Sequence, residues 1–222
     1  KKVAIFDLDG TLDLRDNFKL FLFRILIKSP QKWIYIPHLV FFFLKLYCIK
    51  DYKNRTNLKK IFLKILLSNQ SQNFIENEAI NHVERRIPKK FNSAVYEYFT
   101  LSKKLKKITI LASGSLDVYV KHFAEKLGFD LYISTELNFK KGKFTGEIKN
   151  SNCIGYKKYL KINNYLKINK ISWSDVTFFS NDLSDLHCFK RAKSNYVINP
   201  SKSILKTLDK KLINYKVLNS KS

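Results

Sequence analysis

The chain has 222 residues, which allows one α/β domain with an insertion and excludes two large domains. Hydrophobic residues make up 45% of it, and only 6 Gly and 4 Pro occur, which argues against a loop-rich or disordered chain. The 42 basic and 18 acidic residues give a formal net charge of +24. Such a charge attracts nucleic acid or an anionic membrane surface, but it also fits an ordinary solvated lysine surface.

The three cysteines, Cys48, Cys153 and Cys188, are far apart and form neither a CxxC pair nor a dense framework. We therefore expect a reducing compartment and no disulfides. The apolar segment Val3–Phe6 is too short for the core of a signal peptide and runs directly into acidic residues. These features predict a protein on the cytoplasmic side.

Five short apolar segments have the β-branched and aromatic composition of buried parallel strands: Val3–Phe6, Ile108–Ala112, Leu131–Ser134, Val176–Phe179 and Tyr196–Ile198. Helical patterns lie between them, over Leu116–Leu127, which Gly128 ends, and over Gly155–Leu166. The alternation predicts an α/β fold with a doubly wound parallel sheet, whose functional groups sit at the carboxyl ends of the strands.

Helical patterns interrupt this alternation, so we expect residues 1–16 and 96–222 to form the core and 17–95 an inserted helical cap. Phe18–Ile27 and Trp33–Ile49 are nearly continuous apolar stretches. The second contains a Pro and is shorter than the roughly 20 residues that a spanning helix needs. Three placements stay open: a hairpin that lies on or re-enters the inner membrane, which we favour, a buried cap core, and a true span.

Basic side chains flank the apolar stretches, as anionic lipid headgroups would favour: Lys28, Lys32, Lys45, Lys50 and Lys53. Leu58–Leu67 continues as an amphipathic helix with lysines on one side, for which ordinary packing within the cap is the simpler interpretation. Further on, Glu136–Ile148 has two extended pieces around Lys141-Gly142, which predicts a β-hairpin. We expect this hairpin to form a flap beside the site.

Two carboxylates directly follow the first strand, in the sequence Asp7-Leu8-Asp9-Gly10-Thr11. Residues two apart in an extended backbone project to the same side, and Gly10 lets the chain turn sharply. One carboxylate can attack phosphorus, while the other protonates the leaving oxygen and later activates water. The alternative is a chance pair of Asp residues at a strand–loop junction, which the adjoining strand and Gly-Thr disfavour.

This motif resembles the first motif of the haloacid dehalogenase (HAD) superfamily, in the phosphoserine phosphatase-like branch with a helical cap after the first strand. The resemblance covers nearly the whole chain, because the remaining motifs follow in family order. It implies a Rossmann-like core and a Mg²⁺-dependent phosphatase with an aspartyl-phosphate intermediate. Asp7 would be the nucleophile and a metal ligand, Asp9 the proton-transfer residue and a metal ligand through its carbonyl, and Thr11 would bind phosphate.

The second motif is Ser113-Gly114-Ser115, after the strand that begins at Ile108. Ser113 Oγ and the nearby backbone N–H groups, Gly114 included, can hold phosphoryl oxygens. Alone, the motif is a weak signal, because a Ser-Gly-Ser at a helix start is usually a helix cap. It is not a GxSxG elbow, which excludes a serine hydrolase of that type.

The third motif rests on the resemblance, since the family pattern Gly-x-x-Lys selects Lys158 after Gly155 and disfavours Lys157. The lysine would neutralise the nucleophile and bind the phosphoryl group. In a chain with 42 basic residues, a lysine has no diagnostic value without this order and spacing.

The fourth motif, Ser180-Asn181-Asp182 followed by Asp185, places acids after the strand Val176–Phe179. The family commonly has Asp where Asn181 stands, and an amide brings Mg²⁺ no negative charge. Two ligand assignments stay open, Asn181 or a shifted Asp182, with Asp185 as a further metal-site acid. We favour a working enzyme over a degraded one, because Asp182 restores the lost charge next door.

The substrate is the least determined feature. Asp16 occupies the place where phosphoserine phosphatases have an acid that reads the substrate amino group. The apolar cap argues against such a small zwitterionic substrate. The pattern DLDGTL-x-x-x-D-x-F, followed by an apolar cap and then C-x-G-x-x-K, is similar to bacterial phosphatidylglycerophosphatase C, which implies a lipid phosphate at an anionic membrane surface. The alternatives are a soluble phosphatase of phosphoserine or a sugar phosphate, and a non-catalytic nucleic-acid-binding module, which lacks a recognisable motif. The oligomeric state is left open.

Overall fold

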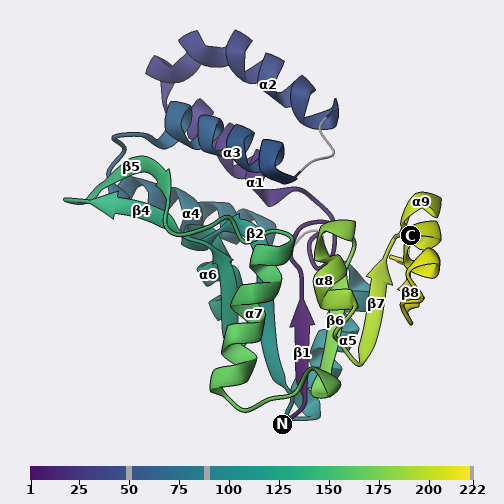
Figure 1. Cartoon of the computed structure of the whole chain (residues 1–222). Helices are drawn as coiled ribbons and strands as arrows, with labels where there is room; N and C mark the ends of the chain where they lie inside the picture. The colour runs from purple at the N-terminus through teal and green to yellow at the C-terminus, as the bar shows by residue number, and fades with distance from the viewer. Residues whose placement is uncertain (49–51, 88–90, 221–222) are drawn as a thin grey trace.

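The computed structural model describes residues 1–48, 52–87 and 91–220 (Figure 1). Its central sheet has six strands in the order β3-β2-β1-β6-β7-β8, and all neighbours pair in parallel. The strands are β1 Val3–Phe6, β2 Ile108–Leu116, β3 Leu131–Thr135, β6 Val176–Ser180, β7 Ser194–Ile198 and β8 Lys216–Leu218. The doubly wound α/β prediction is confirmed, and β8 is an edge strand that the sequence patterns did not reveal.

Helices cover both faces of this sheet (Figure 1). On one face, α5 (Ser93–Lys104) and α6 (Asp117–Leu127) share an apolar cluster with the ring of Phe6, which stacks on Phe179 at 4.4 Å between centroids. On the other, α7 (Tyr156–Ile168), α8 (Leu186–Phe189) and α9 (Lys202–Lys210) pack on a second cluster. Since β1 is buried on both faces, its uninterrupted apolar run follows directly from its central position.

The cap lies beyond the carboxyl ends of the strands (Figure 1). It contains α1 Asn17–Ile27, the 3₁₀ helix η1 Pro30–Tyr35, α2 Ile36–Cys48, α3 Tyr52–Leu67 and α4 Gln72–Arg86. α1 buries Phe21, Leu22 and Ile25 at helical spacing, and α3 buries Phe62 and Leu66 against it. The buried side of the cap therefore joins the same apolar cluster that covers one face of the sheet. The cap helices occupy most of the predicted range 17–95, whose last residues already belong to α5.

The apolar segment that follows α1, made of η1 and α2, is the outermost layer of the cap (Figure 1). Leu39 of α2 is buried, but Trp33, Ile34, Val40 and Phe41 are exposed. A fully buried cap core is therefore wrong for η1 and α2. In the described residues, no helix is both long and apolar enough to span a membrane. The side chains of the predicted flanking residues Lys45, Lys50 and Lys53, and of Cys48, lie outside the description.

The predicted hairpin is present as β4 (Leu137–Lys140) and β5 (Lys143–Ile148), which pair antiparallel. Its predicted role as a flap beside the site is wrong. Backbone bonds tie it to the end of α3 instead, with Asn69 N donating to Phe144 O at 3.1 Å and Phe144 N donating to Gln70 O at 3.0 Å. None of the described residues that line the site cavity comes from it. The buried Phe144 joins the cap core and holds the hairpin there.

Candidate active site

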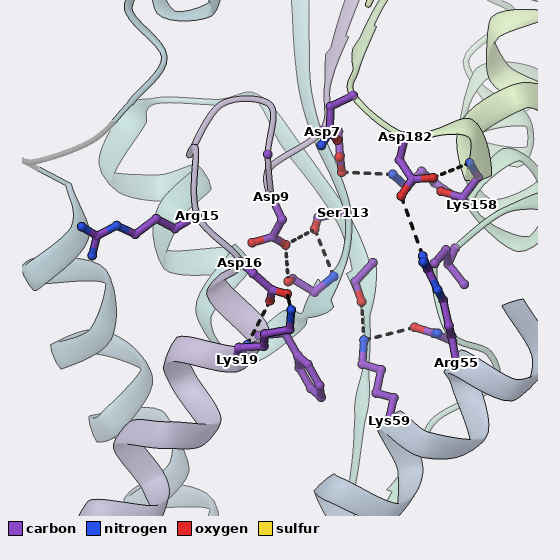
Figure 2. A pocket seen from close by; sticks show the side chains of 18 of the residues that line it. Asp7, Asp9, Arg15, Asp16, Lys19, Arg55, Lys59, Ser113, Lys158 and Asp182 are labelled. Carbon is purple, nitrogen blue, oxygen red and sulfur yellow. Dashed lines mark hydrogen bonds and ion pairs between the residues drawn. The ribbon is translucent and has the colours of Figure 1, made fainter. Parts of the chain in front are cut away.

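A cavity of about 540 Å³ lies where the carboxyl ends of β1, β2 and β6 face the cap helices α1 and α3. Figure 2 shows the side chains that line it, with carboxylates and a lysine on the core side and basic groups from the cap opposite. This edge is where the sequence motifs are expected to converge, because parallel strands all present their carboxyl ends there.

The first carboxylate, Asp7, continues β1 by donating its N–H to Phe179 O at 2.9 Å. Lys158 Nζ lies 3.0 Å from Asp7 Oδ1 and 2.8 Å from Asp185 Oδ2, so one ammonium bridges two carboxylates. Burial raises the pKa of Asp7 to about 7, against the opposing charge of Lys158. Burial alone would lower the pKa of Lys158, but Asp185 and Asp7 together hold it well above its ordinary value. Lys158 therefore stays charged.

The second carboxylate, Asp9, is held at both oxygens. Oδ1 accepts from the backbone N–H of Asn17 at 2.7 Å, and Oδ2 accepts from the hydroxyls of Ser115 and Ser113. Burial raises the pKa of Asp9 to about 6, which suits a group that exchanges protons near neutrality. Gly10, with φ +72°, makes the turn behind it, and a Cβ there would stand 2.1 Å from Asn181 Nδ2.

A buried network behind Asp9 escaped the sequence analysis. Asp13 is fully buried and forms an ion pair with Arg86 of α4, and its Oδ2 accepts from Asn17 Nδ2 at 3.1 Å. Asn17 Oδ1 in turn lies 2.9 Å from His82 Nε2. Burial lowers the pKa of His82 to about 3, so the ring is neutral and donates to Asn17. The only sequence signal is the Asp16-Asn17 pair at a helix start, because nothing local marks His82 or Arg86 as partners.

Thr11 does not face the cavity as a phosphate ligand would. It is fully buried, and its hydroxyl lies 3.2 Å from Asn181 Oδ1 and 3.5 Å from Asp7 Oδ2. Thr11 is not among the described residues that line the cavity. Its geometry is that of a positioning residue between the nucleophile candidate and the fourth motif.

Ser113 and Gly114 both line the cavity, as their motif predicts. The carbonyl of Gly114 accepts from Lys59 Nζ and from Thr135 Oγ1, so the peptide at the tip of β2 is fixed from two sides. Lys59 belongs to α3 and also reaches Asn152 Oδ1 at 3.1 Å. Burial lowers the pKa of Lys59 to about 8. This contact from the cap to the phosphate-loop candidate was missed, because its helix reads as ordinary amphipathic packing.

The fourth motif splits between two directions. Asn181 and Asp182 both line the cavity, and only Asn181 is linked to Asp7, through the Thr11 hydroxyl that contacts both side chains. Asp182 caps the following turn by accepting from Ser184 N at 2.7 Å and faces Arg55 of α3 at 3.9 Å. Asp185 is fully buried, with one oxygen bound by Lys158 and Ser180. Geometry therefore groups Asn181, rather than Asp182, with Asp7.

The residues fit a divalent cation with a weak donor set. Asp7 and Asn181 present oxygens on either side of the Thr11 hydroxyl, and Asp185 Oδ1 is buried without a hydrogen-bond partner. No group of three or more His, Cys, Asp or Glu side chains within the described ranges is arranged to hold a metal ion. The amide at 181 and the ammonium of Lys158 between the two acids account for that shortfall in negative charge.

Asp16 lines the cavity on the cap side. Its Oδ1 caps α1 by accepting from Lys19 N at 3.0 Å, and its Oδ2 lies 3.1 Å from Lys19 Nζ. Further cations on this wall are Arg15, Arg55 and Lys59. The wall that the sequence analysis assigned to substrate recognition is thus predominantly basic, with its one predicted acid already engaged.

Comparisons with known proteins show the family and the fold of this chain. The family model of haloacid dehalogenase-like hydrolases matches residues 4–190. The chain is 31% identical over 166 residues to "Protein CicA" of Caulobacter vibrioides, which covers 72% of this chain and 70% of that protein.

Among solved structures, a protein of unknown function from Bordetella pertussis superimposes with a TM-score of 0.81 at 14% identity, covering 97% of both chains. A phospho-aspartyl intermediate analogue of phosphoserine phosphatase gives 0.68 at 16% identity, covering 100% of this chain and 94% of the other. At such identities the likeness concerns the fold. The family match over most of the chain establishes more: this protein belongs to the haloacid dehalogenase-like hydrolases.

Proposed function

We propose that this hydrolase is a phosphomonoester phosphatase that works through an aspartyl-phosphate intermediate. The observation that carries the proposal is the placement of Asp7 and Asp9 in one cavity, with Lys158 bound to the first and two serine hydroxyls to the second. A nucleophile, a proton donor and cationic support for a phosphoryl group are the parts that phosphoryl transfer to a carboxylate needs.

In the first half-reaction, a carboxylate oxygen of Asp7 attacks phosphorus and the bond to the leaving oxygen breaks. Asp9 gives its proton to that oxygen, which is feasible near neutrality because burial raises the pKa of Asp9 to about 6. Lys158 and the Ser113 hydroxyl stabilise the charge on the phosphoryl oxygens.

In the second half-reaction, Asp9 takes a proton from a water molecule that attacks the phosphorus of the aspartyl phosphate. The bond between phosphorus and the Asp7 oxygen breaks, which releases inorganic phosphate and returns both carboxylates to their starting states. One residue serves as acid and then as base, so its hydrogen bonds to Asn17 and Ser115 have to hold it in place through both steps.

We further propose Mg²⁺ as the cofactor, held by Asp7, Asn181 and the backbone carbonyl of Asp9, with Asp185 next to them. When bound, the cation would neutralise charge on the carboxylate and the phosphoryl group. The support lies in the unpartnered Asp185 Oδ1 and in the closeness of Asn181 and Asp7 to one hydroxyl.

For the substrate, we propose a lipid phosphate such as phosphatidylglycerol phosphate, met at an anionic membrane surface. Arg15, Lys19, Arg55 and Lys59 make the cap wall of the cavity basic, which favours a substrate with a further negative charge near its phosphomonoester. Since Asp16 already binds Lys19 and caps α1, a substrate ammonium gains little there. Soluble phosphoserine is therefore the second candidate.

The test is a turnover screen in detergent with Mg²⁺, covering phosphatidylglycerol phosphate, phosphatidic acid, phosphoserine and sugar phosphates. Asp7→Asn should abolish phosphate release while the folded structure persists by circular dichroism. Asp209→Asn, which changes an exposed carboxylate on α9, serves as the matched control and should keep full activity. Undiminished turnover by Asp7→Asn would remove Asp7 from the role of nucleophile.

A further inference from the structure

The outer surface of the cap carries several large apolar side chains that are exposed to solvent. Six of them, here named the cap roof, lie on η1 and α2: Trp33, Ile34, Tyr35, Val40, Phe41 and Leu44. Ile34 is 76% exposed, Leu44 64% and Phe41 58%. Large exposed apolar patches are rare on monomeric soluble proteins and commonly mark a protein–protein or membrane interaction site.

The cap roof comprises η1 and one side of α2, which follow each other directly in the chain. Val40, Phe41 and Leu44 fall within about 100° of the α2 surface, because residues one and four apart lie on neighbouring helical positions. Leu39 turns inward and joins the cap core, which fixes the orientation of the helix. Figure 1 shows α2 as the layer of the cap farthest from the sheet.

The charges around the cap roof specify its partner. Between Asp16 and Asp51 the sequence has no acidic residue but six basic ones: Lys19, Arg24, Lys28, Lys32, Lys45 and Lys50. Of these, Arg24 forms an ion pair with Glu78, and Lys19 forms one with Asp16. Lys28 and Lys32 directly precede the cap roof in the chain. An apolar face with cations beside it matches an anionic lipid surface, where acyl chains receive the apolar side chains and headgroups bind the lysines. Two copies of this face would repel each other, so the same charges disfavour self-association.

The remaining observations point to a shallow insertion. No described helix is long enough to span. Trp33 donates its Nε1–H to Leu26 O at 2.9 Å, and this hydrogen bond orients the indole ring while 53% of the residue is exposed. Indole rings favour the depth of lipid headgroups.

We propose that the cap roof is a docking face for anionic membranes, which holds the protein on the lipid surface by its cap. The cap roof connects to the cavity through α1, where Phe18 and Lys19 line the cavity wall. The idea that docking brings a lipid phosphate to the cavity rests on the proposed function. The docking itself does not depend on that function.

The experiment uses the full chain and vesicles of phosphatidylglycerol and phosphatidylcholine in equal parts. Wild type should float with them, and Ile34→Glu with Leu44→Glu should lower the bound fraction by roughly tenfold or more. Ile168→Glu is the matched control, because Ile168 is 72% exposed at the end of α7, in the core, and should leave binding unchanged. Less protein should bind to vesicles of phosphatidylcholine alone, and added salt should lower the fraction bound to the anionic vesicles.

A second readout follows insertion directly. In a Trp173→Phe background, Trp33 is the one tryptophan left, since the chain has two. Its emission should shift to the blue with anionic vesicles and stay unshifted with Ile34→Glu and Leu44→Glu in place. Wild type that stays unbound and unshifted would overturn the proposal, as would a dimer that these substitutions dissociate.

Turnover of a soluble aryl phosphate without vesicles separates this proposal from the preceding one. Protein that floats with the vesicles but does not hydrolyse the aryl phosphate would support the docking face and contradict the proposed phosphatase activity. Protein that hydrolyses the aryl phosphate but does not float would support the phosphatase activity and contradict the docking face.

Discussion

The backbone N–H of Asn17 donates to Asp9 Oδ1 at 2.7 Å, so the first residue of cap helix α1 holds the proton-transfer candidate of the core. The N–H groups in the first turn of a helix have no partner within the helix and carry partial positive charge. The Asn17 side chain is itself fixed by Asp13 and His82. Cap and core are thereby coupled at the carboxylate that acts in both half-reactions of the proposed mechanism.

This coupling predicts a difference between two substitutions at one position. Asn17→Ala removes the side-chain bonds but keeps the N–H, whereas Asn17→Pro removes the N–H as well. Proline is tolerated at the first helical residue, and Asp16 before it already has the extended conformation that proline requires. We expect kcat for Asn17→Pro to fall roughly tenfold or more below that of Asn17→Ala, the value of one hydrogen bond to a charged group.

The control for stability is Asn195→Ala, which removes another buried Asn that donates to Phe189 O and Asn214 O in the core. It should lower the melting temperature without changing kcat. Equal kcat values for Asn17→Pro and Asn17→Ala would show that the N–H does not support Asp9.

The raised pKa of Asp9 predicts that removal of its carboxylate stabilises the folded state. Burial raises this pKa from its ordinary 3.8 to about 6, so the folded state holds the proton more tightly than the unfolded state. The resulting penalty is absent below pH 3.8, grows between the two values and is complete above pH 6. Without metal, Asp9→Asn should be inactive and up to about 3 kcal/mol more stable than wild type at pH 8. Denaturant unfolding against pH measures this.

Asp130→Asn should give the opposite sign. Burial would raise the pKa of Asp130, but the hydrogen bonds from Thr109 and Lys103 outweigh it and lower that pKa. Its carboxylate therefore stabilises the fold at neutral pH, and the contribution is lost as the solution becomes acidic. Two variants that shifted stability in the same direction would contradict the argument.

Lys158 predicts a rescue that restores stability without restoring activity. Lys158→Met leaves Asp7 and Asp185 facing each other in a buried site, which should cost about 3–5 kcal/mol at pH 8. Adding Asp185→Asn removes one of the two charges and should recover much of that loss in denaturant unfolding. Turnover should stay low in both variants, because neither returns the ammonium that faces the phosphoryl group. Full turnover by the double variant would make Lys158 purely structural.

The metal proposal predicts unequal effects at two neighbouring positions. Asn181→Asp adds a carboxylate beside Asp7 and should raise the apparent Mg²⁺ affinity roughly tenfold, measured as the Mg²⁺-dependent rise in melting temperature. Asp182→Asn should change that affinity little, because its side chain binds Ser184 N and faces Arg55. A loss of affinity confined to Asp182→Asn would move the ligand to that residue.

Local patterns predicted much of the fold correctly. The five expected strands were confirmed within a few residues, since each is an apolar run in a sheet buried on both faces. The family resemblance was also confirmed. The short edge strand β8 was missed, because Lys216–Leu218 has one apolar pair and no pattern to recognise. The flap failed because a hairpin signal fixes a turn but not the surface on which the hairpin packs.

By itself, the sequence determined what adjacency can determine: two carboxylates two residues apart after a strand, and a glycine that turns the chain behind them. The tertiary structure decided which distant groups meet them. Lys158 reaches Asp7 across 151 positions, and Lys59 reaches Gly114 from the cap. It also decided that Val40, Phe41 and Leu44 of α2 are exposed while Leu39 is buried, since hydrophobicity favours burial but does not specify which partner provides it.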